Sequence, residues 1–285
     1  MSLVITATHS PPSSPLAQEV INRVHEVEDE DNAFAIANSL TVVANEDDVP
    51  KGEEYKQYFE KARDEGRYVI MDNSLHELGE AYDYDRLRYW VNELQPNEFI
   101  VPDVWMNCSQ TAAQAKYWRQ FKYPKKTKLT AVIQGENKNQ AYLCANLLAG
   151  LGYDKLCVSY GATWYNDFFP HTNADMGKAL GRVRFVQGLF KLEQLKDIKF
   201  HLLGCSIPQE FGWYDDGLQS RIESIDTSNP VMAALDGTRY NSNGMNYKPN
   251  ANMNDFFDIK YEDINYFDVL YNTTKFREIN NLKTK

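Results

Sequence analysis

The sequence has few cysteines and no long apolar stretch. Its four cysteines form no Cys-x-x-Cys pair, which argues against a zinc ribbon, a dithiol redox motif and a disulfide scaffold; they are Cys108, Cys144, Cys157 and Cys205. No apolar run approaches the roughly 20 residues that span a bilayer. The N-terminus lacks the basic start and apolar run of a signal peptide. We therefore expect a cytoplasmic protein with reduced thiols and no membrane contact.

Positive charge is also scarce. Lys and Arg total 30 against 40 for Asp and Glu, which gives a net charge of −10. This balance argues against a broad basic shell that wraps nucleic acid, although it leaves room for a local basic path. No glycine-rich phosphate loop (GxGxxG or GxxxxGK[ST]) follows an apolar run, which disfavours nucleotide-binding folds.

Short apolar runs recur along the chain at the spacing expected of strands separated by helices. Segments of helical period lie between them, at 55–62, 87–94 and 141–151. This alternation predicts an α/β fold with parallel strands, and the number of units favours a (β/α)8 TIM-type barrel. We expect an N-terminal arm over 1–32, the barrel over 33–240, and a C-terminal tail over 241–285 that packs on it. The strand candidates are Phe34–Ile36, Tyr68–Met71, Phe99–Val104, Leu129–Ile133, Leu156–Ser159, Phe200–Leu203 and Ile222–Ile225.

Polar residues and glycines follow most of these runs. Because the active site of a β/α barrel is built at the carboxyl ends of its strands, we expect these residues to ring one mouth. Each of them alone also suits a turn or a helix cap, and only their joint placement favours function. They are Asp72, Asp103, Gln134, Gly135, Ser159, Gly161, Gly204 and Asp226.

Five of these segments, in order, resemble the motifs of the tRNA-guanine transglycosylase family. They lie between Tyr68 and Tyr240, and they read DNSLHEL from Asp72, VIQG from Val132, VSYG from Val158, LLGCSIPQE from Leu202 and IDTSNP from Ile225. The family's zinc-binding cysteine cluster is absent after Cys205, so the resemblance implies no metal and no cofactor. This compact form is most similar to the phage-encoded DpdA branch, whose members place 7-deazaguanine derivatives in DNA.

The resemblance implies a base-exchange reaction. Asp226 corresponds to the nucleophile that would hold the sugar as a covalent intermediate, and Asp72 to the general acid/base. Asp103 would accept hydrogen bonds from the N1–H and 2-amino edge of a guanine-like base. The other implied base-binding residues are Gln134, Gly135, Gly161 and Gly204, with Asn73, His76 and Tyr160 as candidates for supporting roles. An aromatic lid over the extracted base would come from Tyr160, Trp164 or Tyr165.

The implied partners are DNA, with tRNA as the alternative, and a 7-deazaguanine base such as preQ0. Homodimers occur in the family that the chain resembles, so the resemblance also implies a possible homodimer. If the chain is phage-encoded, its compartment is the host cytoplasm. Candidate phosphate contacts are Lys178, Arg182, Arg184, Arg221 and Arg239. The position of His201 inside an apolar strand predicts a core histidine.

Two other readings fit the same residues. A barrel glycoside hydrolase would also use a carboxylate pair, here Asp72 and Asp226, and it would release free sugar instead of conserving the polymer. A binding module that recognises a purine without turnover would need no nucleophile.

Overall fold

The computed structural model describes most of the chain as an α/β fold built on a curled parallel sheet. Side chains are described for residues 57, 59–66, 68–73, 75, 83–250 and 265–281, and the strands at 5–6 and 34–38 are described as backbone. His76 lies outside the described residues, and so does most of the predicted N-terminal arm. No helix among the described residues has the length and apolarity needed to cross a membrane.

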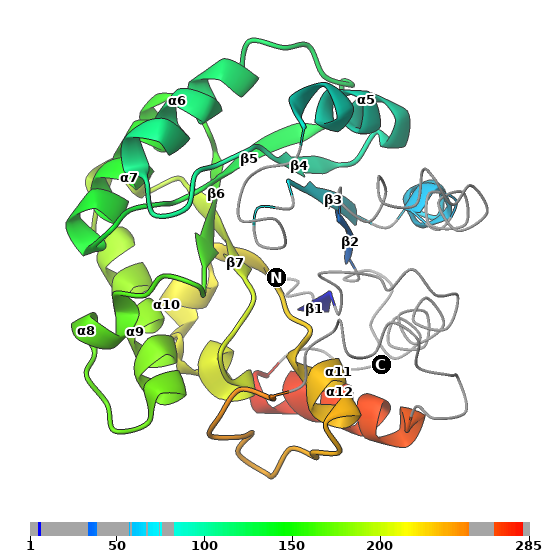
Figure 1. The fold of residues 1–285 in the computed structure, drawn as a ribbon, viewed down its shortest axis with the longest axis vertical. Helices are drawn as coiled ribbons and strands as arrows, with labels where there is room; N and C mark the ends of the chain where they lie inside the picture. Colours follow the sequence, from blue (N-terminus) through cyan, green and yellow to red (C-terminus); the bar gives the residue numbers. More distant parts are fainter. Residues whose placement is uncertain are drawn as a thin grey trace.

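Eight parallel strands are hydrogen-bonded in the order β1-β8-β7-β6-β5-β4-β3-β2 (Figure 1). Strands β3 to β8 form a curled half barrel, with β2 and β1 at its two edges. The described pairings do not join β1 to β2, so the fold is confirmed as a partial barrel. The strands are β1 Ile5–Thr6, β2 Phe34–Asn38, β3 Tyr68–Asp72, β4 Glu98–Ile100, β5 Lys128–Val132, β6 Lys155–Ser159, β7 Lys199–Leu203 and β8 Ile222–Asp226.

Strand β1 was not predicted. Ile5 and Thr6 pair with Ile225 and Asp226 of β8, so this dipeptide belongs to the sheet although the sequence analysis assigned it to a separate arm. Two residues are too short a run for apolar periodicity to show. The sheet therefore begins before the predicted boundary at residue 32.

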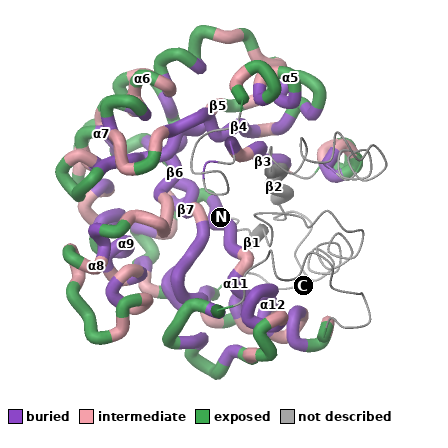
Figure 2. Tube along the Cα trace, viewed as in Figure 1, coloured by how far each residue is buried: buried purple, intermediate pink, exposed green. Residues whose placement is uncertain are grey.

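Helices cover the convex face of the sheet, and their outward sides carry the exposed residues (Figure 2). Six of the helices begin at an Asp or Asn whose side chain accepts a backbone N–H of the first turn: Asp83, Asn107, Asn137, Asn173, Asp215 and Asn265. The helices are α5 Tyr84–Leu94, α6 Cys108–Trp118, α7 Lys138–Gly150, α8 Tyr165–Phe168, α9 Ala174–Leu189, α10 Asp216–Gln219, α11 Asn229–Leu235 and α12 Tyr266–Ile279, with 3-10 turns η2 Glu193–Leu195 and η3 Pro208–Trp213.

The concave side of the sheet is layered. Because side chains alternate along a strand, every second residue points into the curl. A central apolar layer consists of Ile70, Ile100, Val132 and Cys157. Polar residues lie on both sides of it, around Glu98 and Lys155 toward the amino ends of the strands and around Asp103 toward the carboxyl ends. On strands β3 to β6, this apolar layer separates two buried polar clusters.

Helix α12 packs against helix α11, which follows the last strand of the sheet. Val269 contacts Val231 and Ala234 of α11, and Phe276 is part of the main core. Asn280, just past the helix, donates to the carbonyl of Pro208 at 2.8 Å. Residues 251–264 of the predicted C-terminal tail lie outside the described residues.

Candidate active site

A pocket of about 520 Å³, its open mouth included, lies at the carboxyl ends of strands β3 to β7. It brings together four polar residues that the sequence analysis placed at the ends of separate strands: Asp72, Asp103, Gln134 and Ser159. This convergence follows from parallel pairing, because all carboxyl ends then meet at one edge. The lining residues are Asp72, Asn73, Leu75, Asp103, Trp105, Val132, Gln134, Ser159, Tyr160 and Leu203.

Two amide side chains hold the Asp103 carboxylate. Asn73 Nδ2 donates to Oδ1 at 2.9 Å, and Gln134 Nε2 donates to Oδ2 at 2.7 Å. The orientation of each amide is fixed, since Asn73 Oδ1 accepts the N–H of Leu75 and Gln134 Oε1 accepts the N–H of Met106, both at 2.9 Å. Both carboxylate oxygens of Asp103 therefore act as hydrogen-bond acceptors. Each of its oxygens has a further lone pair for a ligand.

Burial raises the pKa of Asp103 to about 6, because only 3% of the residue is exposed. The hydrogen bonds from Gln134 and Asn73 oppose this rise, and the nearby charge of Asp72 adds to it. Two neutral amides do not compensate a buried carboxylate as a cation would. A ligand that brings further N–H donors would relieve this cost.

The loop after β4 provides an aromatic wall that the sequence analysis missed. Trp105 lines the pocket and is 41% exposed. The next residue, Met106, has a left-handed backbone (φ of 52°), which is uncommon for a non-glycine residue, and its N–H donates to Gln134. The indole lies so close to Gly161 that a Cβ there would be 2.6 Å from Trp105. Trp105 follows Asp103 by two residues, and that proximity was the available signal.

The three candidate glycines do not line the pocket as described; each makes room for a neighbour. A Cβ at Gly135 would lie 2.5 Å from the backbone nitrogen of Ala141 in α7. Gly204 has a φ of +61°, and a Cβ there would lie 2.5 Å from the ring of Tyr160. These contacts support the side chains that shape the pocket, so a direct contact with a base remains a prediction.

Of the predicted lid aromatics, Tyr160 lines the pocket and the other two are packed. The indole N–H of Trp164 donates to the carbonyl of Gly135 at 3.0 Å, and the hydroxyl of Tyr165 donates to the carbonyl of Ser159 at 3.0 Å. Both residues are buried. Tyr160 and Trp105 are the pocket's aromatic faces.

Asp226 lies next to the pocket, one strand beyond its last lining strand. It is paired in register with Leu203, which lines the pocket, but Asp226 itself is only 1% exposed and is not among the lining residues. Its Oδ1 accepts the N–H of Gly204 at 3.2 Å and lies 3.0 Å from His201 Nε2. The structure therefore places the two predicted catalytic carboxylates at one end of the barrel, with only Asp72 in the pocket.

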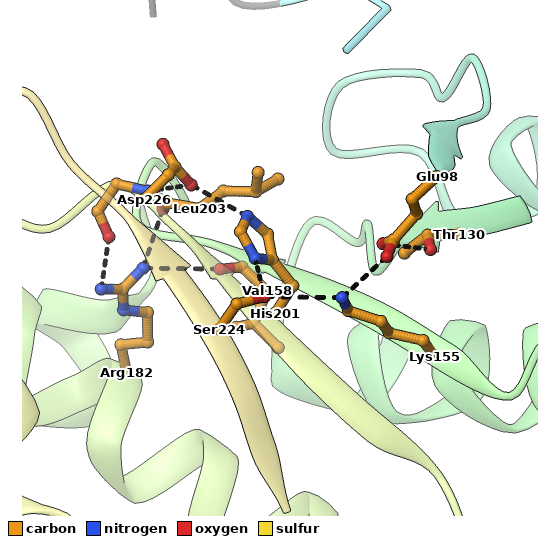
Figure 3. A network of polar contacts seen from close by, with 10 residues as sticks. Glu98, Thr130, Lys155, Val158, Arg182, His201, Leu203, Ser224 and Asp226 are labelled. Atoms are coloured by element: carbon orange, nitrogen blue, oxygen red, sulfur yellow. Dashed lines mark hydrogen bonds and ion pairs between the residues drawn. The ribbon is translucent and has the colours of Figure 1, made fainter. Parts of the chain in front are cut away.

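His201 is buried, as predicted, but it is more than a packed histidine, because it links Asp226 to a polar chain (Figure 3). Ser224 Oγ lies 2.7 Å from His201 Nδ1 and 3.4 Å from Lys155 Nζ. An ammonium only donates, so Ser224 accepts from Lys155, and the same hydroxyl lies within hydrogen-bond distance of Nδ1. Strand register was the missing signal, since His201 faces Ser224 across β7 and β8.

Three of the predicted phosphate-binding arginines are engaged elsewhere. Arg182 is buried and its Nε lies 2.6 Å from Glu210. Arg239 forms an ion pair with Asp268. Arg221 stacks on Phe190 and donates to loop carbonyls. The described residues contain no group of three His, Cys, Asp or Glu side chains that could hold a metal ion.

No protein-family model matches the chain, and no curated protein matches it. Among solved structures, the active domain 2 of a chitinase from Pyrococcus furiosus, crystallised as catalytic-site mutants, is similar over 99% of this chain and 96% of that chain. The sequence identity is 12% and the TM-score is 0.44. A likeness this distant carries no argument about the chemistry of the pocket.

Proposed function

We propose that the protein exchanges a guanine base in DNA for a 7-deazaguanine derivative, on a (β/α)8 barrel completed by β1 and β2. The observation that carries this proposal is the amide-held Asp103 in a pocket that also contains Asp72. Convergent polar groups with a perturbed pKa are typical of an active site.

The base-binding step rests on the acceptor character of Asp103. Guanine presents adjacent N1–H and 2-amino donors on one edge. The two remaining lone pairs of the Asp103 carboxylate match that pair of donors, and binding would relieve the burial that raises its pKa. Trp105 and Tyr160 supply faces on which a base extracted from the stack would lie.

The exchange step is assigned to Asp226 and Asp72. An Asp226 oxygen attacks C1′ of the nucleotide, a C1′–O bond forms and the C1′–N bond to guanine breaks, while Asp72 donates a proton to the leaving base. The incoming base then loses a proton to Asp72 and attacks C1′, which releases Asp226. Because Asp226 is covered, this step requires a movement that opens it to the pocket.

The test is incorporation of radiolabelled guanine and preQ0 into duplex DNA, with tRNA in parallel. Asp226→Asn is the matched control, because it keeps the shape of the side chain and an oxygen for His201. Label in DNA that the control loses would support the proposal. Label in tRNA alone would overturn the substrate, and release of free sugar by the folded protein would overturn exchange in favour of hydrolysis.

A further inference from the structure

Two lysine side chains converge on Tyr160 at the pocket. The ammonium groups of Lys178 and Lys248 each lie 5.0 Å from the centre of the Tyr160 ring, and Lys248 Nζ donates to its hydroxyl at 2.9 Å. The ring cannot shift toward Gly204, because it already occupies the space that a Cβ would take there. Residues from α9, the β6–α8 loop and the segment before residue 250 thus form one rigid positive cluster.

Among the described residues, neither ammonium forms an ion pair within 4 Å of a carboxylate. The charge of Asp175 offsets part of the effect of burial on the pKa of Lys178, and Asp175 accepts the backbone N–H of Lys248 at 2.8 Å. The other neighbouring cation, Arg182, is paired with Glu210. Burial lowers the pKa of Lys178, and the charge of Lys248 contributes to the same shift, so the two ammonium groups raise each other's energy. A bound anion would stabilise both.

We propose that Lys178 and Lys248, held against Tyr160, form an anion site that binds a backbone phosphate of the DNA strand whose base enters the pocket. The choice of DNA rests on the proposed function, whereas the anion site rests on the cluster alone. Lysine ammonium groups bind phosphate as point charges. On a chain with a net charge of −10, such a local cluster supplies attraction that the surface as a whole does not.

The test compares the binding of labelled single-stranded DNA to Lys178→Met/Lys248→Met and to Lys125→Met/Lys126→Met. Both double variants remove two positive charges, and the control pair is exposed in the turn before β5, at the amino end of the strands. Affinity is measured by fluorescence anisotropy over a range of salt concentrations. We expect the first variant to bind at least tenfold more weakly, with a log–log salt slope shallower by about 0.7 for each phosphate that the variant no longer binds.

Several outcomes would separate this site from the proposed reaction. Unchanged affinity and slope in the Lys178/Lys248 variant, with thermal unfolding confirming the fold, would overturn the site. An equal loss of affinity in the control variant would overturn it too, because the effect would then be one of net charge. Inorganic phosphate that competes as well as an oligonucleotide of equal phosphate concentration would overturn the assignment to a DNA strand. A protein that shows the expected slope change but no base exchange would keep the anion site and reject the proposed function.

Discussion

Glu98 and Asp103 are five residues apart, yet they lie in the two polar clusters on opposite sides of the apolar layer. Both carboxylates are buried, with exposures of 0% and 3%. Burial alone would raise the pKa of Glu98, but the charge and hydrogen bond of Lys155, at 2.8 Å, outweigh it and the pKa is lowered. Asp103 has amides where Glu98 has an ammonium, and its pKa is raised to about 6.

The difference shows how strands β3 to β6 keep a structural ion pair apart from the pocket. At the amino ends of the strands, Glu98 also accepts from Tyr68 and Thr130, so that carboxylate is fully occupied and fixed in its charged form. At the carboxyl ends, Asp103 keeps acceptor capacity and a pKa near the working range of an enzyme. A buried carboxylate beside a cation is a structural ion pair, whereas one held by neutral amides is poised for a ligand.

The largest expected effect comes from removing the cation of the structural cluster. Lys155→Met leaves Glu98 as an uncompensated buried charge, which should lower the free energy of unfolding by about 3–5 kcal/mol. Urea denaturation measures the loss. Adding Glu98→Gln to Lys155→Met should recover a large part of it, because no buried charge then remains. A loss below about 1 kcal/mol in the single variant would contradict the assignment.

The two carboxylates should have opposite effects on the pH dependence of stability. The native state holds the Asp103 proton more tightly than the unfolded chain does, so stability from this group is present at low pH and lost as pH rises through about 6. The rise from 3.8 to about 6 corresponds to about 3 kcal/mol at about 1.4 kcal/mol per unit. Glu98 has the reverse sign, because its contribution is present at higher pH and lost as pH falls through its lowered pKa.

Unfolding curves of Asp103→Asn and Glu98→Gln, each compared with the wild type across pH 3 to 7, test this contrast. We expect the wild-type advantage over Asp103→Asn to shrink between pH 4 and 6, and the advantage over Glu98→Gln to grow as pH rises. Two profiles of the same sign would refute the distinction between the clusters.

Substituting Gly204, beside the pocket, and Gly150, at the end of α7, should give a smaller difference in stability. Gly204→Ala introduces a side chain at a φ of +61° and 2.5 Å from the Tyr160 ring, so it should cost about 1–2 kcal/mol and disturb the pocket wall. Gly150→Ala is the matched control, since a Cβ there meets nothing within 4 Å at the end of α7, and it should be neutral or stabilising. Thermal unfolding of both variants checks the difference. Equal effects would show that Gly204 is not constrained by Tyr160.

The sequence predicted most of the strands, because buried parallel strands have continuous apolar sequences. All seven predicted strands are present, and the rule that strand carboxyl ends meet also predicted that Asp72, Asp103 and Gln134 would converge. What the pattern could not predict depends on side-chain conformation. The amide contact of Asn73 with Asp103 spans two strands, and it depends on a rotamer that spacing does not encode.

Register and loop geometry account for the other omissions. The contact between His201 and Asp226 needs the alignment of β7 against β8, including the shift after Phe200. The position of Trp105 depends on the left-handed turn at Met106, and β1 is too short to show a pattern. Sequence reasoning therefore predicted the end of the sheet at which these polar residues gather, whereas the hydrogen-bond network among them depends on side-chain conformation.

The smallest predicted effect is on ligand binding by Asp103. If the ionised form of Asp103 accepts the donor edge of guanine, affinity for guanine should be constant above about pH 6 and fall about tenfold per pH unit below it. Isothermal titration calorimetry with free guanine measures this profile. Glu98→Gln should keep the same profile, since that carboxyl lies at the other end of the barrel. An affinity that stays flat between pH 5 and pH 7.5 would mean that guanine does not bind through Asp103, because a protonated carboxyl cannot offer two acceptors to the N1–H and the 2-amino group at once.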